Sequence, residues 1–134
     1  MRDILAGAVA ILALSMGAAQ AEGDAAAGKK VFAKCKSCHM IGENAKKRVG
    51  PPLNGIVGRA FGAVEGFKYS SSLKDMAENG RVWDKETLDA YLEKPKAVIP
   101  RGRMAFPGLR KEDQREDIIA YLKQFNKDGR KVEK

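Results

Sequence analysis

Both cysteines and the single histidine of this 134-residue chain lie within five consecutive positions, Cys35-Lys36-Ser37-Cys38-His39. Cys-x-x-Cys-His is the attachment pattern of c-type haem, in which each thiol adds to a haem vinyl group and the adjacent imidazole binds the iron. With no second histidine and no further cysteine, bis-histidine ligation and a second covalent haem are both excluded. The motif therefore predicts one haem, one histidine ligand and a sixth ligand of another residue type.

Three other interpretations explain this segment less well. A thioredoxin-type redox motif follows a buried strand, and no β-branched apolar run precedes Cys35. A structural disulfide between Cys35 and Cys38 would suit an exported protein, but it gives no reason for His39. A zinc site needs three or four protein ligands, and the three Cys and His residues here share five positions.

Residues 1–21 have the composition of a cleaved signal peptide. An apolar run from Ile4 to Met16 is followed by Ala19-Gln20-Ala21, which is a small-x-small cleavage site. The uncharged run is shorter than the ~20 residues of a membrane span. We therefore expect cleavage after Ala21, export to the periplasm, and a single domain over residues 22–134 that is not embedded in a membrane.

The chain is basic, with 25 Lys and Arg against 17 Asp and Glu and a net charge of +8. A charge of this size favours nucleic acid, an anionic membrane or an acidic protein as a partner. Export argues against nucleic acid, and no arginine-rich run is present. The composition favours an acidic protein partner, and we expect a monomer.

Helical patterns alternate with long loops. Four helices are predicted from capping residues and apolar periodicity: 23–34 with Asp24 as N-cap, 70–78 before Asn79-Gly80, a helix from Asp84 to Glu93 that Pro95 terminates, and 111–126. Residues 40–68 and 99–109 carry most of the glycines and prolines and are predicted loops. Loops this long are expected only where they wrap a group that is not protein. No strand pair is convincing, so the fold class is all-α.

Methionine is a common sixth ligand of haem iron and raises its reduction potential. Three methionines follow the predicted cleavage site. Met40 adjoins His39 and cannot reach the opposite face of the ring. Met76 lies in a short helix, where packing in the core is the usual role. Met104 lies in the second loop, which can close over the far face, and is the best candidate. A lysine ligand or an open site stays possible.

Several further motifs, in order along the chain, strongly resemble those of class I cytochromes c. They are Val49-Gly50-Pro51-Pro52-Leu53-Asn54-Gly55, Gly66-Phe67-Lys68-Tyr69, the segment from Trp83 to Pro95, and Met104-Ala105-Phe106-Pro107-Gly108-Leu109. The resemblance covers essentially all of residues 22–134 and is greatest to the bacterial cytochrome c2 group, kin to mitochondrial cytochrome c. It implies a small all-α domain whose helices and loops wrap one covalent haem c.

The resemblance also implies a role for each matching residue. Cys35 and Cys38 would form the thioethers, and His39 and Met104 would be the axial ligands. The remaining pocket residues are Pro51, whose carbonyl would accept the His39 N–H; Arg59, Tyr69 and Trp83, which would hold the buried propionate; Tyr91, beside the Met104 sulfur; and Phe106, near the exposed ring edge. Where the first and last helices cross, Gly28 and Phe32 would meet Ile118 and Tyr121.

Five basic residues fall around the exposed haem edge on the family pattern: Lys34, Lys96, Arg103, Arg110 and Lys111. They would form a face for acidic redox partners, namely a cytochrome bc1 complex as donor and a photosynthetic reaction centre or terminal oxidase as acceptor. An iron with both axial positions filled favours electron transfer over catalysis, so we expect no enzymatic activity.

Two departures from the family pattern stand out. Gly102 occupies a position where the family often has a threonine that binds a propionate, and Arg103 replaces a usual lysine. The role of Asn79 is left unassigned. Two other functions stay open: a five-coordinate haem protein in catalysis or gas binding, and a haem-free binding module with a Cys35–Cys38 disulfide.

Overall fold

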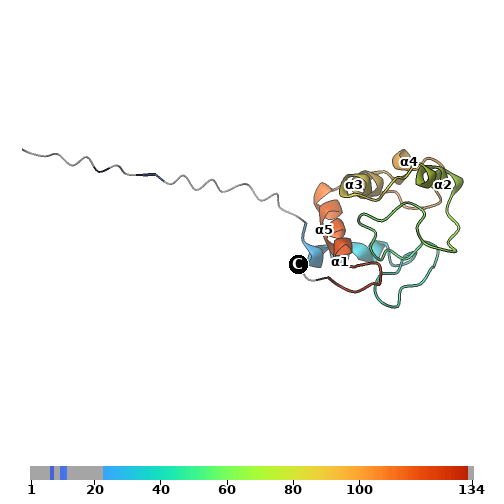
Figure 1. Ribbon diagram of the computed structural model, residues 1–134, viewed down its shortest axis with the longest axis horizontal. Helices are drawn as coiled ribbons and strands as arrows, with labels where there is room; N and C mark the ends of the chain where they lie inside the picture. Colours follow the sequence, from blue (N-terminus) through green and yellow to red (C-terminus); the bar gives the residue numbers. More distant parts are fainter. Residues whose placement is uncertain (1–6, 8–9, 12–22, 133–134) are drawn as a thin grey trace, which may run out of the picture.

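The computed structural model describes residues 23–132 together with Gly7, Ala10 and Ile11. Apart from those three positions, the predicted signal peptide at residues 1–21 lies outside the described residues. The regular elements of the described chain are α1 (Ala25–Val31), a 3₁₀ turn (Phe32–Lys34), α2 (Ser71–Glu78), α3 (Lys85–Glu93), α4 (Pro95–Val98) and α5 (Glu112–Lys123) (Figure 1). Its β structure consists of isolated bridges at Ala60–Val82 and Phe125–Lys131. The all-α prediction is confirmed.

The predicted caps Asp24 and Asp84 are present, Ser70 is a third side-chain cap, and together they fix where three helices begin. Asp24 accepts from the amides of Ala26 and Ala27 and opens α1. In the same way, Ser70 accepts from Leu73 N at 3.2 Å before α2, and Asp84 accepts from Thr87 N at 2.8 Å before α3. Each cap satisfies an amide that has no partner within its helix.

Pro95 has a second role that the sequence prediction missed. It ends α3 at Glu93, as expected, but it is also the first residue of α4. Proline suits this position because the first amide of a helix has no partner inside the helix. The short helix α4 leads directly into the loop that carries Met104.

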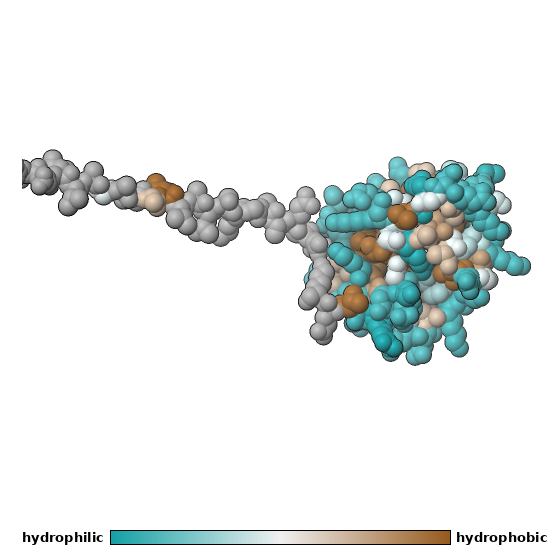
Figure 2. All heavy atoms as spheres, in the orientation of Figure 1, coloured by the Kyte–Doolittle hydropathy of each residue, from teal (hydrophilic) through white to brown (hydrophobic). Residues whose placement is uncertain are grey.

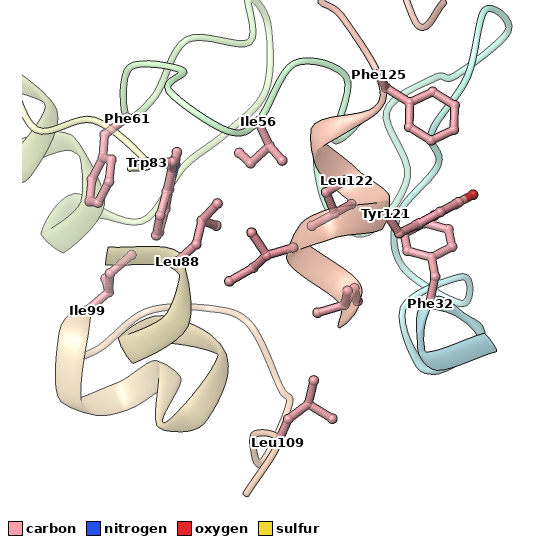
Figure 3. Packing of buried hydrophobic residues seen from close by; sticks show 12 residues of the cluster. Phe32, Ile56, Phe61, Trp83, Leu88, Ile99, Leu109, Tyr121, Leu122 and Phe125 are labelled. Atoms are coloured by element: carbon pink, nitrogen blue, oxygen red, sulfur yellow. The ribbon is translucent and has the colours of Figure 1, made fainter. Parts of the chain in front are cut away.

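Helices α1 and α5 cross near the amino terminus of the described domain (Figure 1). A Cβ on Gly28 would overlap the backbone carbonyl of Asp117 and lie 2.8 Å from Tyr121 Cβ, so only glycine permits this approach. Phe32 packs on Tyr121 with ring centroids 5.4 Å apart (Figure 3). The predicted crossing is confirmed.

Arg115 is a buried cation that helical periodicity did not predict. It is only 7% exposed and joins three parts of the chain. Its Nε donates to Asp89 Oδ1 of α3 at 2.8 Å, and its Nη1 donates to the carbonyls of Leu109 and Arg110 at 3.0 Å each. The hydrogen bond that Arg115 donates to the Asp89 carboxylate raises the pKa of Arg115. Arg115 thereby fixes α5 against α3 and against the end of the Met104 loop.

The loops pack through aromatic contacts and backbone hydrogen bonds. Trp83 stacks on Phe61 with ring centroids 3.9 Å apart (Figure 3). On Tyr91 it packs with ring centroids 4.8 Å apart. Asn54 binds both the amide and the carbonyl of Gly42, each at 2.9 Å, and so ties together two distant parts of the first loop. These contacts give the predicted loop regions a fixed shape without regular structure.

Hydrophilic side chains cover much of the surface, with apolar residues gathered in the middle of one face (Figure 2). Within the described residues, no helix combines the length and apolar character needed to cross a bilayer.

The Asp84 cap gives a pH-dependent prediction. Hydrogen bonds to Thr87 hold the pKa of Asp84 below its usual range, so the stabilisation is present above the unfolded-state pKa of about 3.9 and is lost as pH falls through the folded-state pKa. We expect Asp84→Ala to lower the thermal midpoint by a few degrees at pH 7 and by less at pH 3, as measured by circular dichroism. Asp84→Ser keeps a capping oxygen and is the control. An equal loss for both variants would contradict the capping role.

Candidate functional site

A cavity of about 450 Å³ lies among the helices and both loops. Its size is typical of a site for an organic cofactor. The lining includes Cys35, Cys38, His39, Pro51, Arg59, Tyr69, Trp83, Tyr91, Met104 and Phe106, so the structure brings together every residue that the sequence assigned to the haem and its pocket.

The Cys-x-x-Cys-His segment follows the 3₁₀ turn as one more tight turn. The amides of Cys38 and His39 both donate to the Cys35 carbonyl, at 3.1 and 2.9 Å. This coiling brings both sulfurs and the imidazole to the same cavity. Both thiols are free, and burial raises the pKa of Cys35.

His39 is held in one orientation. Its Nδ1 lies 2.7 Å from the Pro51 carbonyl oxygen and donates to it, which makes Nε2 the ring nitrogen that can bind a metal. Gly50 packs on the ring, since a Cβ there would lie 2.7 Å from Nδ1 and 2.8 Å from Nε2. Burial lowers the pKa of His39, so at neutral pH the imidazole is uncharged, as a metal ligand must be.

Met104 reaches the cavity from the second loop. The Tyr91 hydroxyl donates to the Met104 sulfur across 3.7 Å, which links the loop to α3. Burial raises the pKa of Tyr91 to about 12, so its hydroxyl keeps the proton at neutral pH. Met40 and Met76 do not line the cavity, and Met76 packs against the apolar core as expected.

The hydrogen bonds of Arg59 show whether the cavity suits a haem. Its Nη1 donates to the carbonyls of Pro52 and Asn54 at 2.9 and 3.0 Å. Its Nε is buried and has no hydrogen-bond partner among the residues that the structure describes. A buried guanidinium nitrogen without a partner requires an acceptor, and a haem propionate is one. Burial lowers the pKa of Arg59.

Tyr69 and Trp83 lie in the same cavity wall. Tyr69 Oη accepts from Val64 N at 3.1 Å and keeps its own O–H available to donate. Trp83 is 6% exposed and is fixed between Phe61 and Tyr91. These two residues and Arg59 place hydrogen-bonding groups in the cavity wall.

The five basic residues assigned to docking differ in their positions. All five side chains are exposed, but only Lys34 and Arg103 line the cavity. Lys96 approaches it through a hydrogen bond to the Gly102 carbonyl at 2.5 Å. Arg110 and Lys111 lie just before α5 and outside the lining.

Three other features bear on the sequence analysis. Asn79 is exposed at the end of α2, so it is not a buried polar residue. No group of three or more His, Cys, Asp and Glu side chains could hold a metal ion among the residues searched, which are the described ones; this gives no support to a zinc site. Lys68 also lines the cavity but was not among the five basic residues assigned to docking.

Comparisons with known proteins identify relatives of this chain. The family model for cytochrome c matches residues 25–126. Cytochrome c-550 of Ancylobacter novellus is 52% identical over 106 residues, which cover 79% of this chain and 99% of the relative. Cytochrome c2 of Blastochloris viridis is 46% identical over 131 residues, covering 98% and 99%. The solved structure of cytochrome c2 from Rhodospirillum centenum superposes with a TM-score of 0.73 at 38% identity, covering 78% and 99%.

Proposed function

We propose, on the premise that this chain belongs to the cytochrome c family, that it carries single electrons on a haem held between His39 and Met104. The cytochrome c fold and one covalent haem c follow from the family, and the chain has the two cysteines for attachment. When bound, the haem iron supplies reversible one-electron redox chemistry.

One observation carries the proposal: Cys35, Cys38, His39 and Met104 line the same cavity, with His39 already oriented by Pro51. Cys35 and Cys38 would provide the two thioether links. Nε2 of His39 and the sulfur of Met104 would bind the iron, and the Tyr91 hydroxyl would keep the sulfur in place. Arg59 would donate from its unpartnered Nε to a propionate.

These residues favour electron transfer over catalysis. With His39 and Met104 both bound, the iron would have no position left for a substrate. The chain has no second histidine to act as an acid or base beside it. We therefore propose a carrier without enzymatic activity, in preference to a five-coordinate haem protein.

Absorption spectra of the purified protein test this proposal directly. A pyridine haemochrome spectrum should have the form given by two thioether links. The ferric protein should show the weak near-infrared band of iron–thioether ligation. Rapid carbon monoxide binding by the reduced protein without that band would contradict His/Met ligation and favour the five-coordinate alternative.

The partners and the location are proposed from charge and from the amino terminus. The exposed basic side chains assigned to docking favour acidic redox proteins as partners. We propose a cytochrome bc1 complex as donor and a photosynthetic reaction centre or terminal oxidase as acceptor. The signal-peptide pattern of residues 1–21 supports export to the periplasm.

The docking proposal predicts a salt-dependent kinetic effect. Replacing Lys34 and Lys111 with Ala should slow reduction by an isolated cytochrome bc1 complex by a few fold at low salt, because two charges that steer the encounter are lost. The difference should disappear at high salt, since exposed charges are screened within about 10 Å at 0.1 M salt. Stopped-flow rates at several ionic strengths measure it. The control is the double variant Lys29→Ala/Lys30→Ala, which removes the same charge from α1. Equal slowing by both pairs, or slowing that salt does not remove, would refute docking through Lys34 and Lys111.

A further inference from the structure

The segment that carries Met104 is fastened by basic side chains. Lys96 Nζ donates to the Gly102 carbonyl at 2.5 Å. This bond is local, because Lys96 lies in α4 and Gly102 is only six residues further along the chain. Arg103 Nη1 instead donates to the Lys68 carbonyl at 3.1 Å, a residue 35 positions earlier in the chain. Arg103 and Lys68 both line the cavity. The Arg103 bond therefore joins the two loops at the cavity.

Gly102 itself has no side chain that could bind the cofactor. A Cβ at Gly102 would lie 3.0 Å from the Ile99 carbonyl oxygen and 3.2 Å from Ile99 Cγ2. Ile99 is one of the most deeply buried side chains, at 1% exposure, so it has little room to move. The anchoring of the segment must come from neighbouring residues.

The backbone beside Gly102 also disfavours the closed conformation. Arg101 has φ of +62°, in the left-handed region that non-glycine residues rarely adopt. Such a conformation persists only where surrounding contacts hold it. The contact between the Tyr91 hydroxyl and the Met104 sulfur spans 3.7 Å and involves a weak acceptor, so it is a poor sole restraint.

We propose that Arg103 is a positioning residue for Met104. Through its bond to the Lys68 carbonyl, it holds the Met104 segment closed over the cavity and limits entry of small ligands. This role differs from the docking role expected from the sequence, and it rests on the proposed ligation by Met104. A charge-assisted hydrogen bond of this kind is stronger than one between neutral groups.

The rate of imidazole binding to the ferric holoprotein tests the proposal, because imidazole enters only when Met104 leaves. We expect Arg103→Ala to raise this rate by roughly tenfold, the order of effect of losing one charge-assisted hydrogen bond. Arg103→Lys should stay within about threefold of the wild type, since its ammonium can donate to the same carbonyl. Arg48→Ala is the matched control. It removes an arginine that also donates to a carbonyl, that of Lys36 at 3.3 Å, but away from Met104.

The outcomes separate this inference from the proposed function. If the wild type shows the iron–thioether band but Arg103→Ala binds imidazole at the wild-type rate, the positioning role is wrong and the carrier function stands. The role is also refuted if the rate rises only in proportion to a loss of global stability measured by denaturant unfolding, or if Arg48→Ala accelerates binding equally. A wild type without the band would overturn the ligation itself, and this inference with it.

Discussion

Met104→Ala is expected to abolish the near-infrared band of the ferric protein and to lower its reduction potential. The thioether raises the potential relative to harder donors, and water or an added ligand would replace it. Competition from the tethered sulfur also ends. In the wild type, imidazole can bind only those molecules in which Met104 has left the iron, a fraction of about 10% to 0.1%. Without Met104 every molecule is open to imidazole, so we expect its apparent affinity to rise by the inverse of that fraction, about 10- to 1000-fold. Absorption spectra, imidazole titration and potentiometry measure these changes.

Met76→Ala is the control for this experiment. Met76 is half-buried against the core and lies outside the cavity lining. Its truncation should lower stability by about 2 kcal/mol and leave the band and the potential unchanged. A near-infrared band that persists in Met104→Ala would mean that another residue binds the iron.

The helices could be predicted because their signals are local. Asp24, Ser70 and Asp84 each cap a helix within three residues of their own position, and apolar spacing marks the buried face of α5. A cap and a helical stripe need no knowledge of distant residues. The all-α class and the order of the four longer helices followed from such signals alone.

The rest depends on partners far apart in the sequence. Arg115 is buried because Asp89, 26 residues earlier, and two loop carbonyls meet its guanidinium. Arg103 binds a carbonyl 35 residues away, so residue type alone suggested a free docking charge. Arg59 is a different case, because its partners, the carbonyls of Pro52 and Asn54, are only seven and five positions away. That contact was not predictable because the loop has no periodicity.

The candidate site falls between these cases. Cys35, Cys38 and His39 were identified from one local motif, and Met104 from a process of elimination among three methionines. Pocket residues such as Tyr69 and Tyr91 were assigned only through the family resemblance, because nothing local distinguishes them from core aromatics. Lys68 was missed: it stands in the Gly66–Tyr69 motif, but the family resemblance gave it no role in the pocket.

Removing the haem is expected to unfold the chain. A dry, empty cavity of about 450 Å³ would cost up to roughly 11 kcal/mol at about 24 cal/mol per Å³, which is comparable to the whole stability of a typical domain, about 5–15 kcal/mol. The double variant Cys35→Ser/Cys38→Ser makes the test possible, because its haem would be held by axial ligation alone. Acid–acetone extraction should strip this variant completely, and the extracted chain should lose its helical circular dichroism signal.

The wild type, extracted and returned to buffer in the same way, is the control for acid damage. Its two thioethers should retain the haem, so its helical signal should recover. A single variant, Cys35→Ser, should retain haem through Cys38 and also refold, at lower stability. If the stripped double variant kept wild-type helicity and a cooperative thermal transition, α1, α3 and α5 would form a self-sufficient core, and the long loops would not need a haem to hold their shape.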